Sequence, residues 1–364
     1  MDMDVEPNHV KNKSKGSEEA RSLPMAMFTM DRSSKKRLLF DVTTRTIRSV
    51  TSSVFADATC AFENGGWLLM IQRNKPPPPV AFVEQQAAVF LIHPTTGTRL
   101  DLPPLSPSSS SGFFVFYVNS HGAPLVVAHV EAISLVPTVH VACPGDLFWS
   151  VYKHDVDVAA MEEETHQHQP WRRRQRRRLV EPVSIADVAL VGTPAVCLDA
   201  GGEVLVFDVA EMTWRRRTPA VIPDGGGIAE YERSLVAAGG EVVLVSRPRA
   251  VGNAAASRFF RLDMAELEWA PMERRELDDT SWFLRKGQSF RAKDPGKRRV
   301  YVFGGGSTAA EASVAGGSSG IKSITNVYGY GLDDGSVEMV IPASIVTEGC
   351  RWVRPSVFAT SAAT

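Results

Sequence analysis

The stretch VLVFDVAEMTWRRR (204–217) combines an apolar run, Asp208, a short polar segment and, six residues after the aspartate, Trp214. A run rich in Val and Phe predicts a β-strand, and the polar segment predicts a turn into a second strand. An aspartate that ends a strand accepts hydrogen bonds from nearby backbone amides and so sets the turn. We therefore interpret this stretch as one β-hairpin, in which Asp208 shapes the turn and Trp214 packs in the core rather than binding a ligand.

The same pattern recurs along the chain, and the repetition favours a structural role for the aspartates over a catalytic one. A hairpin that repeats in one chain indicates a repeat architecture. The further copies are LLFDVTTRTI (38–47) with Asp41 and Ile47, FFRLDMAELEW (259–269) with Asp263 and Trp269, and AVFLIHPTTGTRL (88–100), which has His93 in place of the aspartate.

The spacing of these copies suggests the size of the repeating unit. The separation is 52 residues from Asp41 to His93, 55 from Asp208 to Asp263, and 115, or two periods, from His93 to Asp208. A unit of this length holds four short strands with their turns, which is the size of one β-propeller blade. The sequence therefore predicts an all-β, kelch-like β-propeller of about six four-stranded blades; a large β-sandwich is the alternative. Glycine pairs suited to tight turns precede predicted strands at 65–66, 201–202 and 239–240.

We expect one domain with tails and inserted loops. Residues 1–22 are polar and predict a disordered tail, residues 23–355 form the propeller, and 356–364 form a C-terminal tail. A charged insertion is expected at 161–180 and a Gly/Ala/Ser-rich one at 307–320.

The overall charge and the cysteines exclude several classes of protein. Forty basic and forty-one acidic residues give a net charge of −1, so no global field attracts nucleic acid or anionic membranes. The charged first 22 residues do not predict a secretory signal, and no apolar stretch reaches the length expected of a membrane span. We expect a protein of the cytoplasm, the nucleus or both. The four cysteines, Cys60, Cys143, Cys197 and Cys350, are far apart and predict reduced thiols rather than a zinc site.

The strongest local charge feature is an arginine run beside Trp171. It is interpreted as a solvated loop, with nuclear import or phosphate binding as alternatives. His166 and His168 lie nearby, but a flexible polar segment does not preorganise a metal site. The run comprises Arg172, Arg173, Arg174, Arg176, Arg177 and Arg178.

No enzyme motif is visible in the sequence. The chain lacks a G-x-S-x-G elbow, a P-loop and an H-E-x-x-H helix. Gly304–Gly306 follow a predicted strand but precede no predicted helix, which indicates a blade turn. We expect no catalytic residue, no cofactor and no metal.

Several motifs together resemble one known family. HPTTGTRLDLPPL (93–105) is similar to an "NP-x-T-G-x-x-x-x-LPPL" signature, with His93 replacing the asparagine, and ACPGDLFWSVY (142–152) is similar to an "RPGD-x-x-W" element. Over residues 22–355 the chain resembles the plant F-box-associated β-propeller domain of unknown function, the one carried by kinase-interacting F-box proteins. An F-box itself is not visible in the sequence.

The resemblance implies a module that binds a protein partner. The chain would be the substrate-recognition part of an SCF-type ubiquitin ligase, in contact with its adaptor, or a diverged stand-alone relative. The alternatives are a propeller enzyme with an active site in the central channel and a nuclear factor that uses the arginine run.

Overall fold

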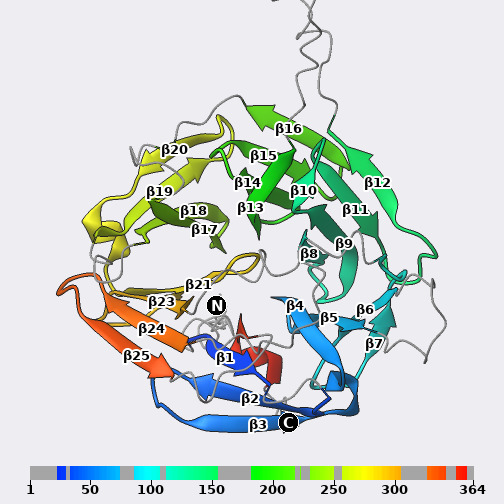
Figure 1. Cartoon of the computed structure of the whole chain (residues 1–364), viewed down its shortest axis with the longest axis horizontal. Coiled ribbons are helices and arrows are strands. Elements are labelled where there is room, and N and C mark those ends of the chain that lie inside the picture. The colour runs from blue at the N-terminus through cyan, green and yellow to red at the C-terminus, as the bar shows by residue number, and fades with distance from the viewer. Residues whose placement is uncertain are drawn as a thin grey trace, which may run out of the picture.

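The computed structural model of the chain describes residues 23–29, 33–73, 86–106, 112–154, 182–217, 222, 230–249, 256–304, 326–341 and 350–358. Within these residues nearly all regular structure is β-strand, joined by three short 3-10 helices, η3 (Ser53–Phe55), η8 (Arg274–Leu277) and η9 (Pro355–Phe358). Six small sheets stand in a ring around a central axis (Figure 1). The prediction of an all-β propeller with about six four-stranded blades is confirmed.

Three blades contain the strands of the first half of the chain, and blade 1 also contains β26 from its last part. Their strands, from the axis outward, are β26 (Arg351–Val353), β1 (Met25–Phe28), β2 (Lys36–Asp41) and β3 (Ile47–Thr51) in blade 1; β4 (Ala58–Asn64), β5 (Trp67–Arg73), β6 (Ala87–Ile92) and β7 (Arg99–Asp101) in blade 2; and β8 (Gly112–Val118), β9 (Pro124–Glu131), β11 (Thr138–Ala142) and β12 (Ser150–Lys153) in blade 3.

The second half of the chain forms the other three blades, two of which carry a fifth strand. Blade 4 has β13 (Val183–Leu190), β14 (Pro194–Asp199), β15 (Val204–Asp208) and β16 (Thr213–Arg217), with β10 (Ile133–Ser134) added beside β13; blade 5 has β17 (Tyr231–Ala238), β18 (Glu241–Pro248), β19 (Arg258–Asp263) and β20 (Glu268–Pro271); and blade 6 has β22 (Phe290–Lys293), β21 (Thr280–Leu284), β23 (Arg299–Gly304), β24 (Asn326–Gly331) and β25 (Val337–Ile341).

The ring is closed in blade 1, where strands from the two ends of the chain share a sheet. β26 pairs antiparallel with β1, with Met25 opposite Val353 and Met27 opposite Arg351. β1 in turn pairs with β2 along Met25–Phe28. The last described strand is therefore the innermost strand of the first blade.

The hydrophobic core lies between neighbouring blades. The apolar strands predicted from Val, Ile, Leu and Phe supply both faces of each sheet, so adjacent sheets pack face to face. Met27 and Leu39 of blade 1, for example, cluster with Leu68 and Phe90 of blade 2. η9 adds the buried Val357 to the same cluster, so regular structure continues beyond residue 355.

The two faces of the disc carry different connections. Because neighbouring strands run antiparallel in blades 1 to 5, the turns after their first and third strands lie on one face, here named the turn face. The connections after the second and fourth strands lie on the other, named the loop face. The segment from β20 to β21 is an exception and reaches the turn face, because β21 runs parallel to β23. The predicted tail 1–22 and the predicted insertions 161–180 and 307–320 lie outside the described residues.

Candidate functional site

The repeated aspartates occupy equivalent turns on the turn face of three different blades. In each turn the Oδ1 atom accepts two backbone N–H bonds, from the residues two and three places further on. The distances are 2.8 and 3.1 Å at Asp41, 2.9 and 3.1 Å at Asp208, and 2.8 and 3.1 Å at Asp263. These carboxylates stand on separate blades, so the structure does not bring them together as a site.

Two further blades form the equivalent turn with other residues in place of the aspartate. In blade 2 the Nδ1 atom of His93 lies 3.4 Å from the backbone N of Thr96 and takes the place of the carboxylate. In blade 6 Gly331 stands at the aspartate position, and a Cβ atom there would lie 2.1 Å from Oδ1 of Asp334. The carboxylate of Asp334 thus fills the space and accepts the N–H of Ser336 at 3.0 Å.

The two repeat tryptophans lie at blade contacts. Trp269 is buried with Leu244 and Phe260 of its own blade and with residues of blade 4. Trp214 is half-buried, with its ring centroid 5.1 Å from that of Phe207. Neither ring lines the cavity described below.

The central channel is occupied by the loop that joins β21 to β22, residues 285–289, here named the channel loop. In Figure 1 this hairpin extends from blade 6 toward the centre of the ring. β21 pairs parallel with β23, the single parallel pair among the described strands. Ser289 closes the loop, because its Oγ accepts the N–H of Arg285 at 3.0 Å and donates to the carbonyl of Arg285 at 2.9 Å.

Asp187 of β13 in blade 4 holds the channel loop of blade 6. Its side chain is fully buried and accepts the N–H of Gly287 at 2.6 Å and the N–H of Leu235, in blade 5, at 2.7 Å. A third bond comes from the N–H of Val188 at 2.9 Å. Burial raises the pKa of Asp187 to about 7, against the effect of these three hydrogen bonds. One carboxyl group therefore joins blades 4, 5 and 6.

The channel loop also contacts the inner strands of blades 1, 2 and 3. The amide side chain of Gln288 pairs with the backbone of Glu63 in β4: Oε1 accepts its N–H at 2.9 Å, and Nε2 donates to its carbonyl. Gly287 has φ +81°, and a Cβ atom there would lie 3.1 Å from Phe113 and 3.7 Å from Nη1 of Arg351. The loop is thus held by inner strands around the whole ring.

Arg351 adds a positive charge beside this loop. Its Nε donates to the carbonyl of Cys60 at 3.0 Å. Burial first, and the charge of Arg285 second, lower the pKa of Arg351 to about 9, while Asp187 acts in the opposite direction. Arg351 and Asp187 therefore both lie beside Gly287.

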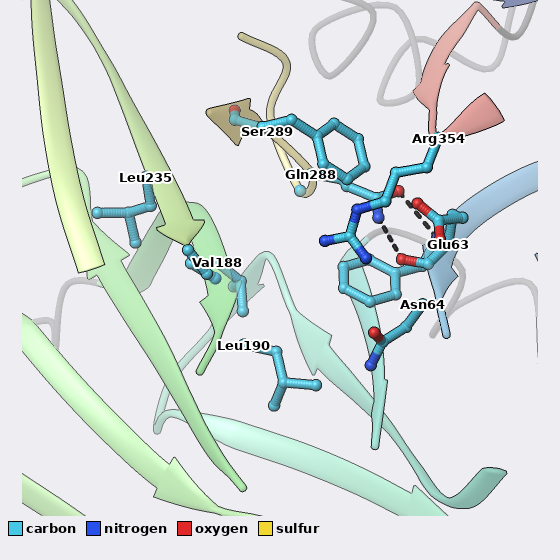
Figure 2. Close-up of a pocket in the computed structure, with 13 residues that line it drawn as sticks. Glu63, Asn64, Val188, Leu190, Leu235, Gln288, Ser289 and Arg354 are labelled. Atoms are coloured by element: carbon cyan, nitrogen blue, oxygen red, sulfur yellow. Dashed lines mark hydrogen bonds between the residues drawn. The ribbon is translucent and has the colours of Figure 1, made fainter. Parts of the chain in front are cut away.

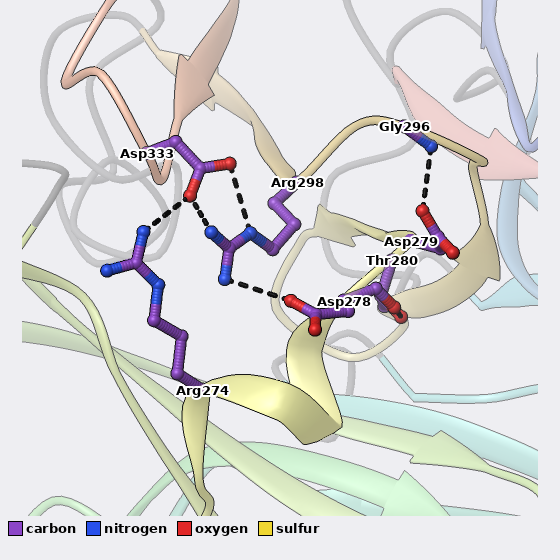
Figure 3. A network of polar contacts seen from close by, with 7 residues as sticks. All are labelled: Arg274, Asp278, Asp279, Thr280, Gly296, Arg298 and Asp333. Atoms are coloured by element: carbon purple, nitrogen blue, oxygen red, sulfur yellow. Dashed lines mark hydrogen bonds and ion pairs between the residues drawn. The ribbon is translucent and has the colours of Figure 1, made fainter.

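A polar network on the turn face anchors the base of the same hairpin. Arg298 forms ion pairs with Asp333 and, at 3.1 Å, with Asp278 (Figure 3). Arg274 of η8 joins Asp333 at 2.9 Å, and Asp279 accepts the N–H of Gly296 at 2.7 Å. Exposed ion pairs contribute little stability. Their role is to fix the segment that leads into β21.

A small cavity lies beside the channel loop. Its volume is about 60 Å³, enough for a few water molecules and well below the roughly 300 Å³ or more of a small-molecule site. Glu63 and Arg354 are its ionisable lining residues (Figure 2). The other lining residues are Phe62, Asn64, Val188, Ala189, Leu190, Leu235, Ala237, Gly287, Gln288, Ser289 and Phe290.

A second feature is the turn between β11 and β12 of blade 3, residues 143–149, here named the blade 3 turn. The carboxylate of Asp146 accepts the N–H of Cys143 at 2.7 Å, and the N–H of Asp146 donates to the carbonyl of Cys143 at 3.1 Å. Gly145 has φ +94°. Nε1 of Trp149 donates to the carbonyl of Pro103 in the LPPL segment at 3.0 Å. The LPPL motif and the PGD-x-x-W motif are thus in contact. The hydrogen bonds of Asp146 and Trp149 fix the backbone at the two ends of this turn.

Two residues of the blade 3 turn face solvent. Leu147 is 79% exposed and Phe148 is 80% exposed, the highest values among the large apolar side chains of the described residues. The equivalent turn of blade 1 carries the short polar residues Thr43 and Thr44, and in that of blade 5 the apolar Leu267 is buried. Sequence reasoning did not single out this pair or Asp187. The signals available were two apolar residues in a polar turn, and one aspartate inside an apolar strand.

Several predicted features remain predictions. The arginine run 172–178, His166 and His168 lie outside the described residues. In the part of the chain that the structure describes, no cluster of three or more His, Cys, Asp or Glu side chains could hold a metal ion. Cys60, Cys197 and Cys350 are buried, and burial raises the pKa of each thiol. No described helix is long and apolar enough to span a membrane.

The ring of six sheets, closed by β26 and β1, defines the protein as a six-bladed β-propeller. The chain belongs to the KIB1-4 beta-propeller family, whose model matches residues 39–301. This agrees with the resemblance inferred from the LPPL and PGD-x-x-W motifs. None of the curated proteins matches the chain.

Solved structures resemble the chain only distantly. The β-propeller domain of the Trilobed protease from Pyrococcus furiosus is 9% identical with a TM-score of 0.35, covering 84% of this chain and 73% of that one. A puromycin-hydrolyzing peptidase from Mycobacterium tuberculosis is 11% identical with a TM-score of 0.37, covering 89% and 45%. The Cps50 (Swd1) β-propeller domain of Myceliophteria thermophila is 11% identical with a TM-score of 0.33, covering 83% and 78%. Likenesses at this level carry no argument about function.

Proposed function

We propose that this protein is a non-enzymatic propeller that recognises a protein partner through its surface turns and loops. The observation that carries the proposal is the channel loop. An active site in the channel needs open space where several titratable groups converge on a substrate. The channel loop fills that space with hydrogen bonds to the surrounding strands, and leaves a cavity of about 60 Å³.

Recognition by rim segments also suits the scaffold. The blades form a rigid ring, and connecting turns on such a scaffold can vary without disturbing the core. The family resemblance makes the substrate-recognition part of an SCF-type ubiquitin ligase the first specific role to test. A stand-alone binding module is the other form of the same proposal.

The test is affinity purification of the full chain, with and without a proteasome inhibitor, followed by rebinding of the recovered partner in purified form. The proposal expects direct binding of the partner. Glu63→Gln and Arg354→Ala should each change the affinity for this partner by no more than about twofold, because these two side chains line the cavity rather than the binding surface. A ligase role additionally expects the adaptor and the cullin in the purified sample. Loss of binding in both cavity variants, or no direct partner at all, would overturn the proposal.

A further inference from the structure

The blade 3 turn combines exposure with rigidity, which is unusual for large apolar side chains. Leu147 and Phe148 project from a turn whose backbone is fixed by Asp146 on one side and by Trp149 on the other. A contact residue that is already held in its bound conformation loses little entropy on association. Such residues are well suited to be the central anchors of an interface.

The shape of this feature defines the shape of its partner. Side chains that are 79% and 80% exposed protrude from the surface, so they cannot form a groove for a peptide. Insertion into an apolar pocket on another molecule would bury them most completely. Val151, on the adjacent strand β12, is also exposed and extends the apolar surface beyond the turn.

The charges beside the turn indicate what surrounds that pocket. Gly145 N–H contacts the carbonyl of Asp101 at 3.4 Å, which places Asp101 of blade 2 next to the turn. The carboxylate of Asp101 is 70% exposed and is paired with Arg99, and Asp146 is exposed as well. Acidic side chains at the rim favour a partner with Lys or Arg around its pocket. They disfavour anionic lipid, which attracts basic segments instead.

We infer that Leu147 and Phe148 form the anchor of a docking surface that inserts into an apolar pocket, rimmed by basic residues, on a folded partner protein. This inference rests on the proposed function, which it narrows to one turn on the turn face. Ile133 and Leu135 provide a matched control, because they are 58% and 65% exposed and belong to the connection after the second strand of blade 3, on the loop face, where Ile133 pairs with β13 of blade 4.

The first experiment places the photo-crosslinking residue p-benzoylphenylalanine at position 148 of the full chain, and at position 135 in the control. Irradiation in cells should cross-link one partner from position 148 only, at an apolar pocket with neighbouring Lys or Arg. A cross-link to a second copy of this chain, a cross-link at a flat polar surface, or no cross-link specific to position 148 would overturn the inference.

The second experiment measures affinity for the purified partner. Leu147→Ser with Phe148→Ser should weaken binding about 30-fold or more, as expected for a pair of hot-spot residues. Ile133→Ser with Leu135→Ser should leave binding unchanged, and both double variants should keep the melting temperature of the parent. Asp101→Asn should slow association several-fold, and the slowing should disappear at high salt.

The outcomes separate the inference from the proposed function. If the partner still binds the Leu147→Ser/Phe148→Ser variant with parental affinity, the inference fails while the protein-binding function stands. If the parent chain binds no protein, the proposed function itself fails. Phe148-dependent binding to phosphatidylcholine/phosphatidylserine vesicles, in the absence of protein binding, would identify a lipid surface as the occupant and would also overturn the inference.

Discussion

Replacing Asp187 with asparagine should change how the stability of the protein depends on pH. Burial raises the pKa of Asp187 from 3.8 to about 7. Between these values the folded protein holds a proton that the unfolded chain has released. The stability contributed by this proton is therefore full below about pH 4 and is lost as the pH rises through about 7.

The size of the effect follows from the shift. One pH unit corresponds to about 1.4 kcal/mol when the folded and unfolded states differ by one proton. Between about pH 5 and about pH 7 the titration of Asp187 should thus lower the free energy of unfolding by at most about 2.7 kcal/mol. Asparagine cannot accept all three hydrogen bonds, so the variant also loses about 1–3 kcal/mol, but this loss does not vary with pH.

The measurement must separate Asp187 from His129, which acts in the opposite direction. Burial, followed by the nearby His140, lowers the pKa of His129 from 6.5 to about 3, so its contribution to stability is lost as the pH falls through this range. Urea unfolding of the parent and of Asp187→Asn, at half-unit steps between about pH 5 and about pH 8, cancels the His129 effect in the difference. The difference in the free energy of unfolding between the parent and the variant should decrease as the pH rises. A difference that stays constant across the range would refute the interpretation of Asp187 as a buried, titrating carboxyl group.

Three further predictions concern the turns and the channel loop. Gly287→Ala should destabilise the protein by about 1–3 kcal/mol more than Gly122→Ala, because both glycines have φ near +80° but of the two only Gly287 has a close neighbour, Phe113. Thermal unfolding of the two variants measures this difference. Equal losses of stability would contradict the packing of the channel loop. Gly331→Asp should lower the melting temperature because Asp334 already fills that space, and adding Asp334→Gly should restore it by recreating the turn of the other blades; no rescue in the double variant would count against this equivalence. Trp149→Phe should reduce stability by about 1 kcal/mol through loss of the bond to Pro103 and should increase hydrogen exchange in the blade 3 turn; unchanged exchange there would show that Trp149 does not hold the turn.

The framework of the propeller could be predicted from the sequence because its determinants are local. The aspartate turns depend on residues two and three positions apart, and the period follows from counting between them. His93 could be recognised as a variant of the same turn for the same reason. The family motifs then agreed with the repeat.

The candidate sites could not be predicted because their determinants are distant in sequence. The segment RKGQS (285–289) has the composition of an ordinary surface turn. Its partners Asp187 and Glu63 lie 100 and 225 positions away, and only ring closure brings them to it. Likewise, Leu147 and Phe148 have the composition of core residues. Their exposure results from the anchoring of Trp149 on the neighbouring blade, which spacing alone does not reveal.

The pairing of β26 with β1 affects how the protein can be made. Arg351–Val353, the inner neighbour of Met25–Phe28, is synthesised more than three hundred residues after it. Until then the first blade has an open edge and an uncovered apolar face, which are the features that chaperones bind and that lead nascent chains to aggregate. A premature stop shortly before residue 351 would leave that edge permanently open. Such a product should be degraded rather than accumulate as a shorter propeller.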